Sequence, residues 1–166
     1  MSKHTTVRAV TPEDTAAITA IYNHYIQTSL ATFEEQPVTT EDMAQRIATC
    51  SANGYPWLVA VSQGVITGYA YAGVWKARSA YRFTSEITVY LHPQYYRTGN
   101  GTALYSALFE ALRATPVRTV IAVITLPNEA SVALHEKFAM HKVAHFAQVG
   151  FKFNQWQDVG YWQGAL

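Results

Sequence analysis

Apolar and polar positions alternate along several segments of the chain, which is the period of a half-buried strand. The clearest case is Thr84–Leu91, where Ile87 and Val89 alternate with Glu86 and Thr88. Similar patterns predict further strands at residues 6–10, 57–61, 65–74, 143–151 and 157–163. A continuous apolar run predicts a strand that is covered on both faces at residues 119–124.

Helical periodicity and cap residues predict four helices between these strands. They cover residues 11–27, 39–49, 103–114 and 128–138, where Thr39 or Thr40 opens the second helix and Asn128 caps the fourth. The third helix is expected to bury one stripe of small and branched side chains, namely Ala103, Leu104, Ala107, Leu108, Ala111 and Leu112. Together the elements predict a single α/β domain over residues 1–166 with a mixed sheet.

Composition narrows the classes of function and partner. Of the 166 residues, 49% are hydrophobic and 14% are charged, and the formal net charge is +1. Lys and Arg are scattered, so we expect neither a nucleic-acid partner nor an anionic membrane surface. The single cysteine, Cys50, allows no intramolecular disulfide, which fits a reducing compartment. With no apolar run long enough to span a membrane, the expected location is the cytoplasm.

A glycine-containing turn joins the strand Thr84–Leu91 to the third helix. The segment Arg97–Thr102 can direct successive main-chain N–H groups at a phosphate, with the positive end of the helix dipole behind them. Neither an ATP-binding P-loop nor a dinucleotide fingerprint matches this segment. Glu86 lies a few residues upstream. It is either a general base beside a phosphorylated cofactor or part of a solvated strand face.

Other candidate residues have both a functional and a structural interpretation. His135 and Asn128 lie on the fourth helix, where histidine is commonly packing and asparagine is a preferred cap. The loop Trp75–Arg78, with Tyr81, is either solvated or supplies cations that hold an anionic substrate group. The histidines are dispersed and no metal-ligand spacing occurs, so we expect no metal site.

Several of these segments together resemble a known family. The run Glu86-Ile87-Thr88-Val89-Tyr90-Leu91-His92-Pro93, followed by Arg97-Thr98-Gly99-Asn100-Gly101, resembles the acetyl-CoA-binding core of the Gcn5-related N-acetyltransferases (GNAT). Further segments are similar to the phosphinothricin and methionine sulfoximine N-acetyltransferases of that superfamily. They include residues 23–26, 32–33, 55–60, 71–81, 126–128, 134–136, 149–152 and 156–163. The resemblance is collinear over nearly the whole chain.

The resemblance implies a GNAT-like α/β domain with a splayed pair of central strands, and acetyl-CoA as co-substrate. Its implied catalytic residues are Glu86 as general base and His135 near the thioester sulfur. The implied cofactor-binding residues are Val89, Tyr90, Leu91, Arg97, Thr98, Gly99, Asn100, Gly101, Thr102 and Asn128. The implied substrate-binding residues are Phe33, Trp75, Lys76, Arg78, Tyr81 and Thr88. It also implies a homodimer acting on the α-amino group of a small amino acid or analogue.

Two other functions stay open at this point. The chain could acetylate another amine, such as a protein N-terminus or a polyamine, or it could be a non-catalytic acyl-CoA sensor. Lys76 and Arg78 favour an anionic acceptor over a polyamine, and the presence of Glu86 beside the loop argues against a sensor. Two positions depart from the family pattern: Tyr96 replaces the usual Gln or Arg, and Ala139 replaces a glycine suited to a left-handed helix end.

Overall fold

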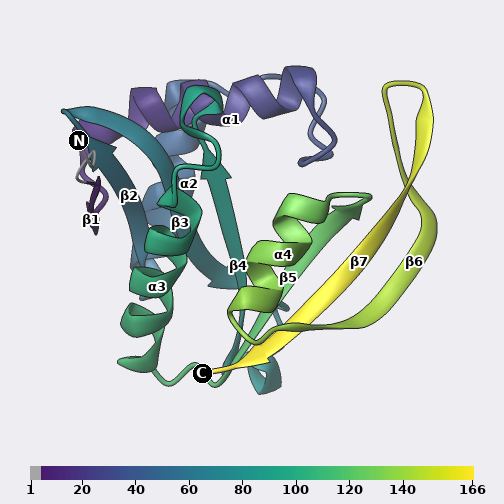
Figure 1. Ribbon diagram of the computed structural model, residues 1–166. Coiled ribbons are helices and arrows are strands. Elements are labelled where there is room, and N and C mark those ends of the chain that lie inside the picture. The colour runs from purple at the N-terminus through teal and green to yellow at the C-terminus, as the bar shows by residue number, and fades with distance from the viewer. Residues whose placement is uncertain (1–4) are drawn as a thin grey trace.

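Seven strands form one mixed sheet in the computed structural model, which describes residues 5–166 (Figure 1). They are β1 (Thr5–Ala9), β2 (Trp57–Ser62), β3 (Val65–Val74), β4 (Thr84–Leu91), β5 (Thr119–Leu126), β6 (His141–Lys152) and β7 (Gln155–Ala165). The spatial order is β1-β2-β3-β4-β5-β7-β6, and β4–β5 is the parallel pair among otherwise antiparallel neighbours. This arrangement confirms the predicted α/β class and mixed sheet.

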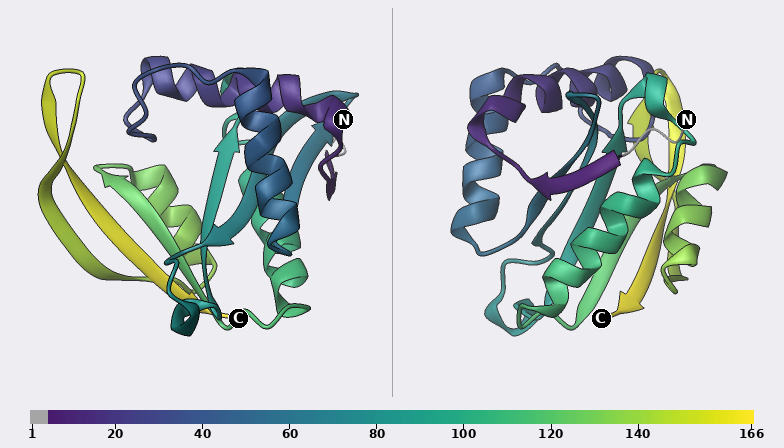
Figure 2. Two further views of the ribbon diagram at one scale, coloured as in Figure 1. Left: turned by 180° about the vertical axis from the view of Figure 1, so that it is seen from behind. Right: turned by 60° about the vertical axis from the view of Figure 1, so that its left-hand side comes forward.

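The helices lie on both faces of the sheet (Figures 1 and 2). They are α1 (Thr15–Thr28), α2 (Thr40–Ala52), α3 (Asn100–Arg113) and α4 (Glu129–Lys137), with short 3-10 turns η1 (Pro12–Asp14), η2 (Ser79–Tyr81) and η3 (Pro93–Tyr95). Thr39 caps α2, because its hydroxyl accepts from Asp42 N–H at 3.1 Å while its own N–H donates to the Asp42 carboxylate. Local cap chemistry therefore sets where this helix begins.

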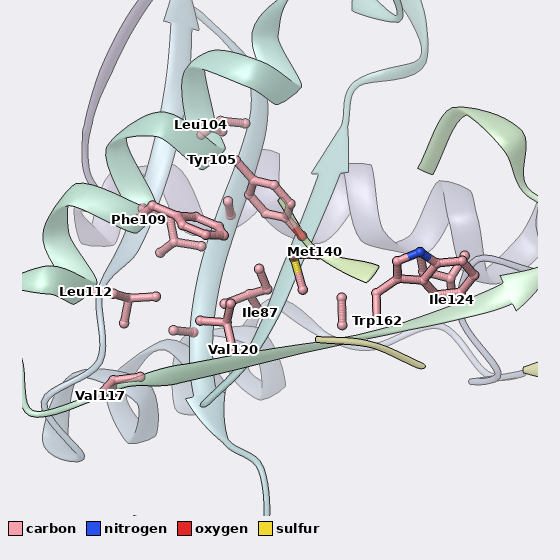
Figure 3. Packing of buried hydrophobic residues seen from close by; sticks show 14 of the residues in the cluster. Ile87, Leu104, Tyr105, Phe109, Leu112, Val117, Val120, Ile124, Met140 and Trp162 are labelled. Carbon is pink, nitrogen blue, oxygen red and sulfur yellow. The ribbon is translucent and has the colours of Figure 1, made fainter. Parts of the chain in front are cut away.

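Two hydrophobic cores form, one on each side of the sheet. On the α1 and α2 side, Ile18 and Ile26 pack with Val59 and Tyr69 at 0–1% exposure. On the other side, α3 packs against β2 to β5, and Figure 3 shows Leu104 and Leu112 among these side chains. The sheet is thus held between two layers, and α3 is fixed over β4.

The buried face of α3 differs from the predicted stripe. The structure buries Leu104, Tyr105, Leu108, Phe109 and Leu112, whereas Ala103, Ala107 and Ala111 are only partly buried. The reason is the neighbouring helix: the Phe138 ring lies 5.6 Å from that of Tyr105 and 5.1 Å from that of Phe109. Large aromatic side chains bury more area than alanines, so the helix turns them inward.

The second half of the sheet ends in a long β6–β7 hairpin that projects from the body (Figures 1 and 2). Both strands are longer than predicted, and β6 has register shifts near Ala144 and before Gly150. The prediction that β5 is covered on both faces is wrong at Val123, whose side chain is 41% exposed. The helices α1 and α2 lie over the first half of the sheet, so the same face of β5 is left open (Figure 2).

The two central strands separate partway along their length. Thr84–Glu86 pair with Thr119–Ile121, and the pairing between β4 and β5 ends there. The rest of β4 keeps its partner on the β3 side as far as Leu91. The predicted splayed pair is therefore confirmed, and the gap begins at Glu86.

Candidate active site

A cleft of about 500 Å³ lies where β4 and β5 separate. It is bordered by both strands, the turn before α3, the start of α4 and the loop after α1. Most of the predicted site residues line it. They are Phe33, Glu86, Thr88, Val89, Tyr90, Leu91, Arg97, Gly99, Gly101, Thr102, Asn128 and His135. The chain fold thus brings residues of three helices (α1, α3 and α4), four strands (β3, β4, β5 and β7) and two loops to a single site.

The turn Arg97–Thr102 presents a row of unpaired main-chain donors. Arg97 and Gly99 have φ values of +60° and +84°, and α3 begins directly afterwards. Within residues 5–166, the N–H groups of this turn have no acceptor, and the first bonded amide is Ala103 N–H to Gly99 C=O at 3.0 Å. Such a row at a helix N-terminus is suited to an anion such as phosphate.

Two side chains of the turn hold its shape and do not line the cleft. Asn100 is 1% exposed and accepts a hydrogen bond from the Thr5 hydroxyl at 2.8 Å. The Thr98 hydroxyl donates to Tyr95 C=O at 2.6 Å. These residues can therefore contribute to the predicted anion site only through their main-chain N–H groups.

The open edge of β4 exposes main-chain groups of alternate residues. His92 N–H donates to Thr67 C=O at 2.9 Å, so the even-numbered residues of β4 bond to β3. The main-chain groups of Val89 and Leu91 consequently face the gap, where Leu91 C=O accepts from the Tyr25 hydroxyl. Tyr90 directs its main-chain groups at β3, so its main chain cannot pair with a ligand in the gap.

Glu86 is half-buried in the cleft at the point where β4 and β5 part. Burial raises the pKa of its carboxyl, and the nearby positive charge of Lys76 partly opposes the increase. Among the described residues that line the cleft, Glu86 is the one carboxylate. A carboxyl with a raised pKa is a more effective proton acceptor near neutral pH than an ordinary surface glutamate.

His135 is buried, and its hydrogen bonds define its tautomer. Its Nδ1 lies 2.7 Å from Ser131 C=O, which can only accept, so Nδ1 carries the proton. Burial lowers the pKa of His135, which favours the neutral ring. Its Nε2 therefore accepts from the Tyr105 hydroxyl at 2.8 Å. Held in this way, His135 has no free proton to direct into the cleft.

The predicted cation loop lies outside the cleft. Trp75 and Tyr81 pack edge to face at 5.2 Å, and the Lys76 ammonium lies 5.4 Å from the Trp75 ring. Arg78 is exposed at the start of η2, and none of these residues lines the cleft. Only Lys76 is electrostatically coupled to a cleft residue, Glu86.

Four tyrosines line the cleft and were not predicted as site residues: Tyr25, Tyr71, Tyr96 and Tyr105. Tyr71 lies opposite Thr88 in the β3–β4 register. The alternation of side chains along β3 indicates on which face of the sheet Tyr71 lies, but not that this face borders a cleft. Tyr105 comes directly after Leu104 and was not part of the predicted buried stripe of α3. Its ring is buried because it packs against Phe138 at the end of α4.

Three further features bear on the chemistry. The Cys50 thiol is buried against Ala72 C=O, and burial raises its pKa to about 11, so it is not an activated nucleophile. Among residues 5–166, no cluster of histidine, cysteine and acidic side chains is placed to hold a metal ion. In the same part of the chain, no helix has the length and apolar character needed to cross a membrane.

Comparisons with known proteins identify relatives over nearly the whole chain. A family model described as an acetyltransferase (GNAT) domain matches residues 7–160. The chain is 42% identical over 157 residues to a phosphinothricin N-acetyltransferase of Streptomyces viridochromogenes, covering 95% of this chain and 85% of that protein. It is 35% identical to an L-methionine sulfoximine/L-methionine sulfone acetyltransferase of Salmonella typhimurium, covering 97% and 94%.

A solved structure supports the same relationship. A GNAT superfamily phosphinothricin acetyltransferase from Sinorhizobium meliloti, in complex with acetyl-CoA, superposes with a TM-score of 0.95. The two chains are 36% identical, and the match covers 100% of this chain and 89% of that one.

Proposed function

This chain belongs to the GNAT family of acetyltransferases, and from that premise we propose that it transfers an acetyl group from acetyl-CoA to an α-amino group. The acceptor is a small amino acid or analogue of the phosphinothricin, methionine sulfoximine or methionine sulfone type, as in the relatives. The observation that carries the proposal is one cleft that combines unpaired N–H donors, an open strand edge and a half-buried glutamate.

The residues at the cleft fit acetyl-CoA, which would supply an activated acyl group as its thioester. The N–H groups of Arg97–Thr102 would hold its pyrophosphate. The main-chain groups of Val89 and Leu91 would bond to its pantetheine arm, as a strand would. Asn128 would also contact that arm, since it lines the cleft while its Oδ1 caps α4 by accepting from Ser131 N–H.

Glu86 would act as the general base. Even at a peptide terminus an α-amino group has a pKa of ~7.7–8.0, so at neutral pH the group is mostly protonated and cannot attack a carbonyl carbon. Glu86 would remove that proton directly or through one water. The N–H of Val89 faces the same gap and would donate to the carbonyl oxygen on which negative charge develops. As the amine nitrogen bonds to the carbonyl carbon, the carbon–sulfur bond would break, and CoA would leave as a thiolate that takes up a proton.

The hydrogen bonds of His135 favour a positioning role over the catalytic role that the family resemblance implied. Since its Nδ1–H is bonded to Ser131 and its Nε2 accepts from Tyr105, it holds the Tyr105 hydroxyl in one orientation. We assign His135 to positioning Tyr105 rather than to donating a proton itself.

The alternative functions are less consistent with the cleft. A polyamine acceptor would require several acidic side chains, whereas Glu86 is the one carboxylate among the described residues of the lining. A sensor would not need a carboxyl of raised pKa beside the predicted thioester position. Thiol release in the presence of an amine separates an enzyme from a sensor.

The direct test is a thiol-release assay with acetyl-CoA and a panel of acceptors. The panel contains ordinary amino acids, their phosphinic and sulfoximine analogues, a polyamine and an N-terminal peptide. We expect amino acids or analogues with a free α-amino group and an anionic group to give the highest kcat/KM. Preference for the polyamine or the peptide would overturn the assignment of acceptor class.

The unpaired donors of the glycine turn can be tested at Gly101. Gly101→Val should raise the acetyl-CoA KM by about tenfold, because a branched side chain obstructs close approach to the turn. A Cβ added at this position would lie 3.3 Å from the Leu134 side chain. Ala103→Val, on the same helix but outside the cleft, is the control. Equal acetyl-CoA affinity in both folded variants would refute the pyrophosphate assignment.

Substitutions of Lys76 and Arg78 should differ in their effect on the pH profile of kcat/KM. Because Lys76 lowers the pKa of Glu86, Lys76→Met should raise that pKa and move the acid limb of kcat/KM to higher pH. Arg78→Ala serves as the matched control, since Arg78 is exposed outside the cleft, and it should leave the limb in place. A shift in the control alone would mean that Arg78, not Lys76, acts on the site.

We also propose a cytoplasmic homodimer. The single cysteine is a buried free thiol, which suits a reducing compartment. The β6–β7 hairpin carries a set of exposed large hydrophobic side chains, which in water favours association. They are Val143, Phe146, Val149, Phe151, Phe153 and Trp156. Sedimentation equilibrium of the wild type measures the mass directly.

A further inference from the structure

Lys152, at the end of β6, is a buried lysine that forms no ion pair with a carboxylate of residues 5–166. Its residue is 2% exposed, and its ammonium donates to Ser29 C=O and Thr32 C=O, both at 2.8 Å. These two carbonyls belong to the loop after α1, more than a hundred residues away in the sequence. A buried ammonium must keep such hydrogen bonds, so the loop and the hairpin are held together at this point.

A second contact joins the same two segments. The ring of Phe33 lies directly over Gly150 of β6, where a Cβ would be 2.3 Å from one ring carbon and 2.4 Å from another. Only glycine leaves room for the ring in this position. Phe33 itself is 38% exposed and lines the cleft together with Ala31 and Thr32.

The loop covers the face of β4 that carries the base. Side chains of Glu86, Thr88 and Tyr90 share one face of that strand. The Tyr90 hydroxyl donates to Ala31 C=O at 3.3 Å, so the loop lies over this face. The loop is also joined to α1 and α2. The Tyr22 hydroxyl of α1 is hydrogen bonded to the Thr32 hydroxyl. Arg46 of α2 forms a bidentate ion pair with Glu34, with N–O distances of 2.7 and 2.8 Å.

We propose that Lys152 and Gly150 are positioning residues that hold the Ala31–Phe33 segment as the acceptor-side wall of the cleft. The inference rests on the proposed function, since the Glu86 face is where the amine would bind. It follows from the positions of the three wall residues. Thr32 supplies one of the two carbonyls that Lys152 binds, with Ala31 and Phe33 on either side of it in the chain. The Phe33 ring packs directly over Gly150. The segment Val149–Lys152 of the hairpin thereby acquires a role in acceptor binding although it does not line the cleft.

The first experiment compares Lys152→Met, Lys152→Arg and wild type. We expect Lys152→Met to raise the acceptor KM by about tenfold while the acetyl-CoA KM stays unchanged, because two partly buried carbonyls lose their donor. Lys152→Arg should recover part of the loss. Lys142→Met, which removes an exposed lysine from the same strand, is the control and should behave as wild type. Equal changes in both KM values would overturn the proposal.

Hydrogen exchange of the loop gives a readout that does not depend on turnover. Amides of residues 29–36 should exchange faster in Lys152→Met than in wild type, with or without acetyl-CoA. Unchanged exchange would overturn the proposal. Absence of thiol release by the wild type with every amino acid would instead refute the proposed function, so the two failures are distinguishable.

A double-mutant cycle covers the possibility that Lys152→Met does not fold. Gly150→Ala should raise the acceptor KM because the added methyl group displaces the Phe33 ring. In a Phe33→Ala background the same change should have no further effect on the acceptor KM. Additive effects of the two substitutions would show that Gly150 does not act through Phe33.

Discussion

Replacing Glu86 with glutamine is expected to lower kcat by about 10²–10⁴-fold, the usual contribution of a positioned general base. The amide has nearly the same shape as the carboxyl group but cannot accept a proton from an ammonium group. Because Glu86 lies where β4 and β5 separate and pairs with Gly73 in the β3 register, the backbone geometry should be preserved. The acetyl-CoA KM should therefore change little.

The pH profile provides the diagnostic measurement. In the wild type, kcat should fall as the pH decreases through the raised pKa of Glu86, because the protonated carboxyl cannot act as a base. This acid limb should disappear in Glu86→Gln. Glu110→Gln removes an exposed carboxylate from α3 and is the matched control. Turnover close to wild type in Glu86→Gln would show that the amine loses its proton to bulk water.

Truncating Leu108 to alanine is expected to reduce the free energy of unfolding by about 2–5 kcal/mol. The residue is 0% exposed and belongs to the core between α3 and the sheet (Figure 3 shows its neighbours in that cluster). Removing three buried carbon atoms leaves a cavity that rigid strands on one side cannot fill. The effect matters for function because α3 carries the glycine turn at its N-terminus.

Urea denaturation measures this loss through the midpoint of the transition at constant slope. Ser106→Ala, an exposed position on the same helix, should change stability by no more than about 0.5 kcal/mol. A loss below about 1 kcal/mol in Leu108→Ala would mean that the helix is not anchored through this core.

Local signals in the sequence were sufficient to predict most helices and strands. The strands Val65–Val74 and Thr84–Leu91 have the predicted bounds, and the Thr39–Asp42 box starts α2. At the end of α4, Ala139 adopts a φ of +59°, the left-handed conformation for which the family resemblance implies glycine. These features depend on residues no more than about four positions apart, so periodicity and cap chemistry describe them well.

The sequence alone also identified the glycine turn and Glu86, because a donor-rich helix start and an acid on the preceding strand are adjacent along the chain. Only the tertiary structure decided which side chains reach the cleft. It placed Arg78 outside, directed Asn100 toward Thr5, and left His135 without a free proton. Each outcome depends on packing between distant segments, which local periodicity does not encode.

The contact of Lys152 and Gly150 with the loop after α1 shows the same limit most clearly. Strand periodicity predicted a strand over residues 143–151, which includes Gly150 and ends one residue before Lys152. The hydrogen bonds of Lys152 to two carbonyls some 120 residues away depend on the length and register of β6 in the folded sheet. Chain segments this far apart meet only when the sheet brings them together, and burial then determines which polar groups must pair.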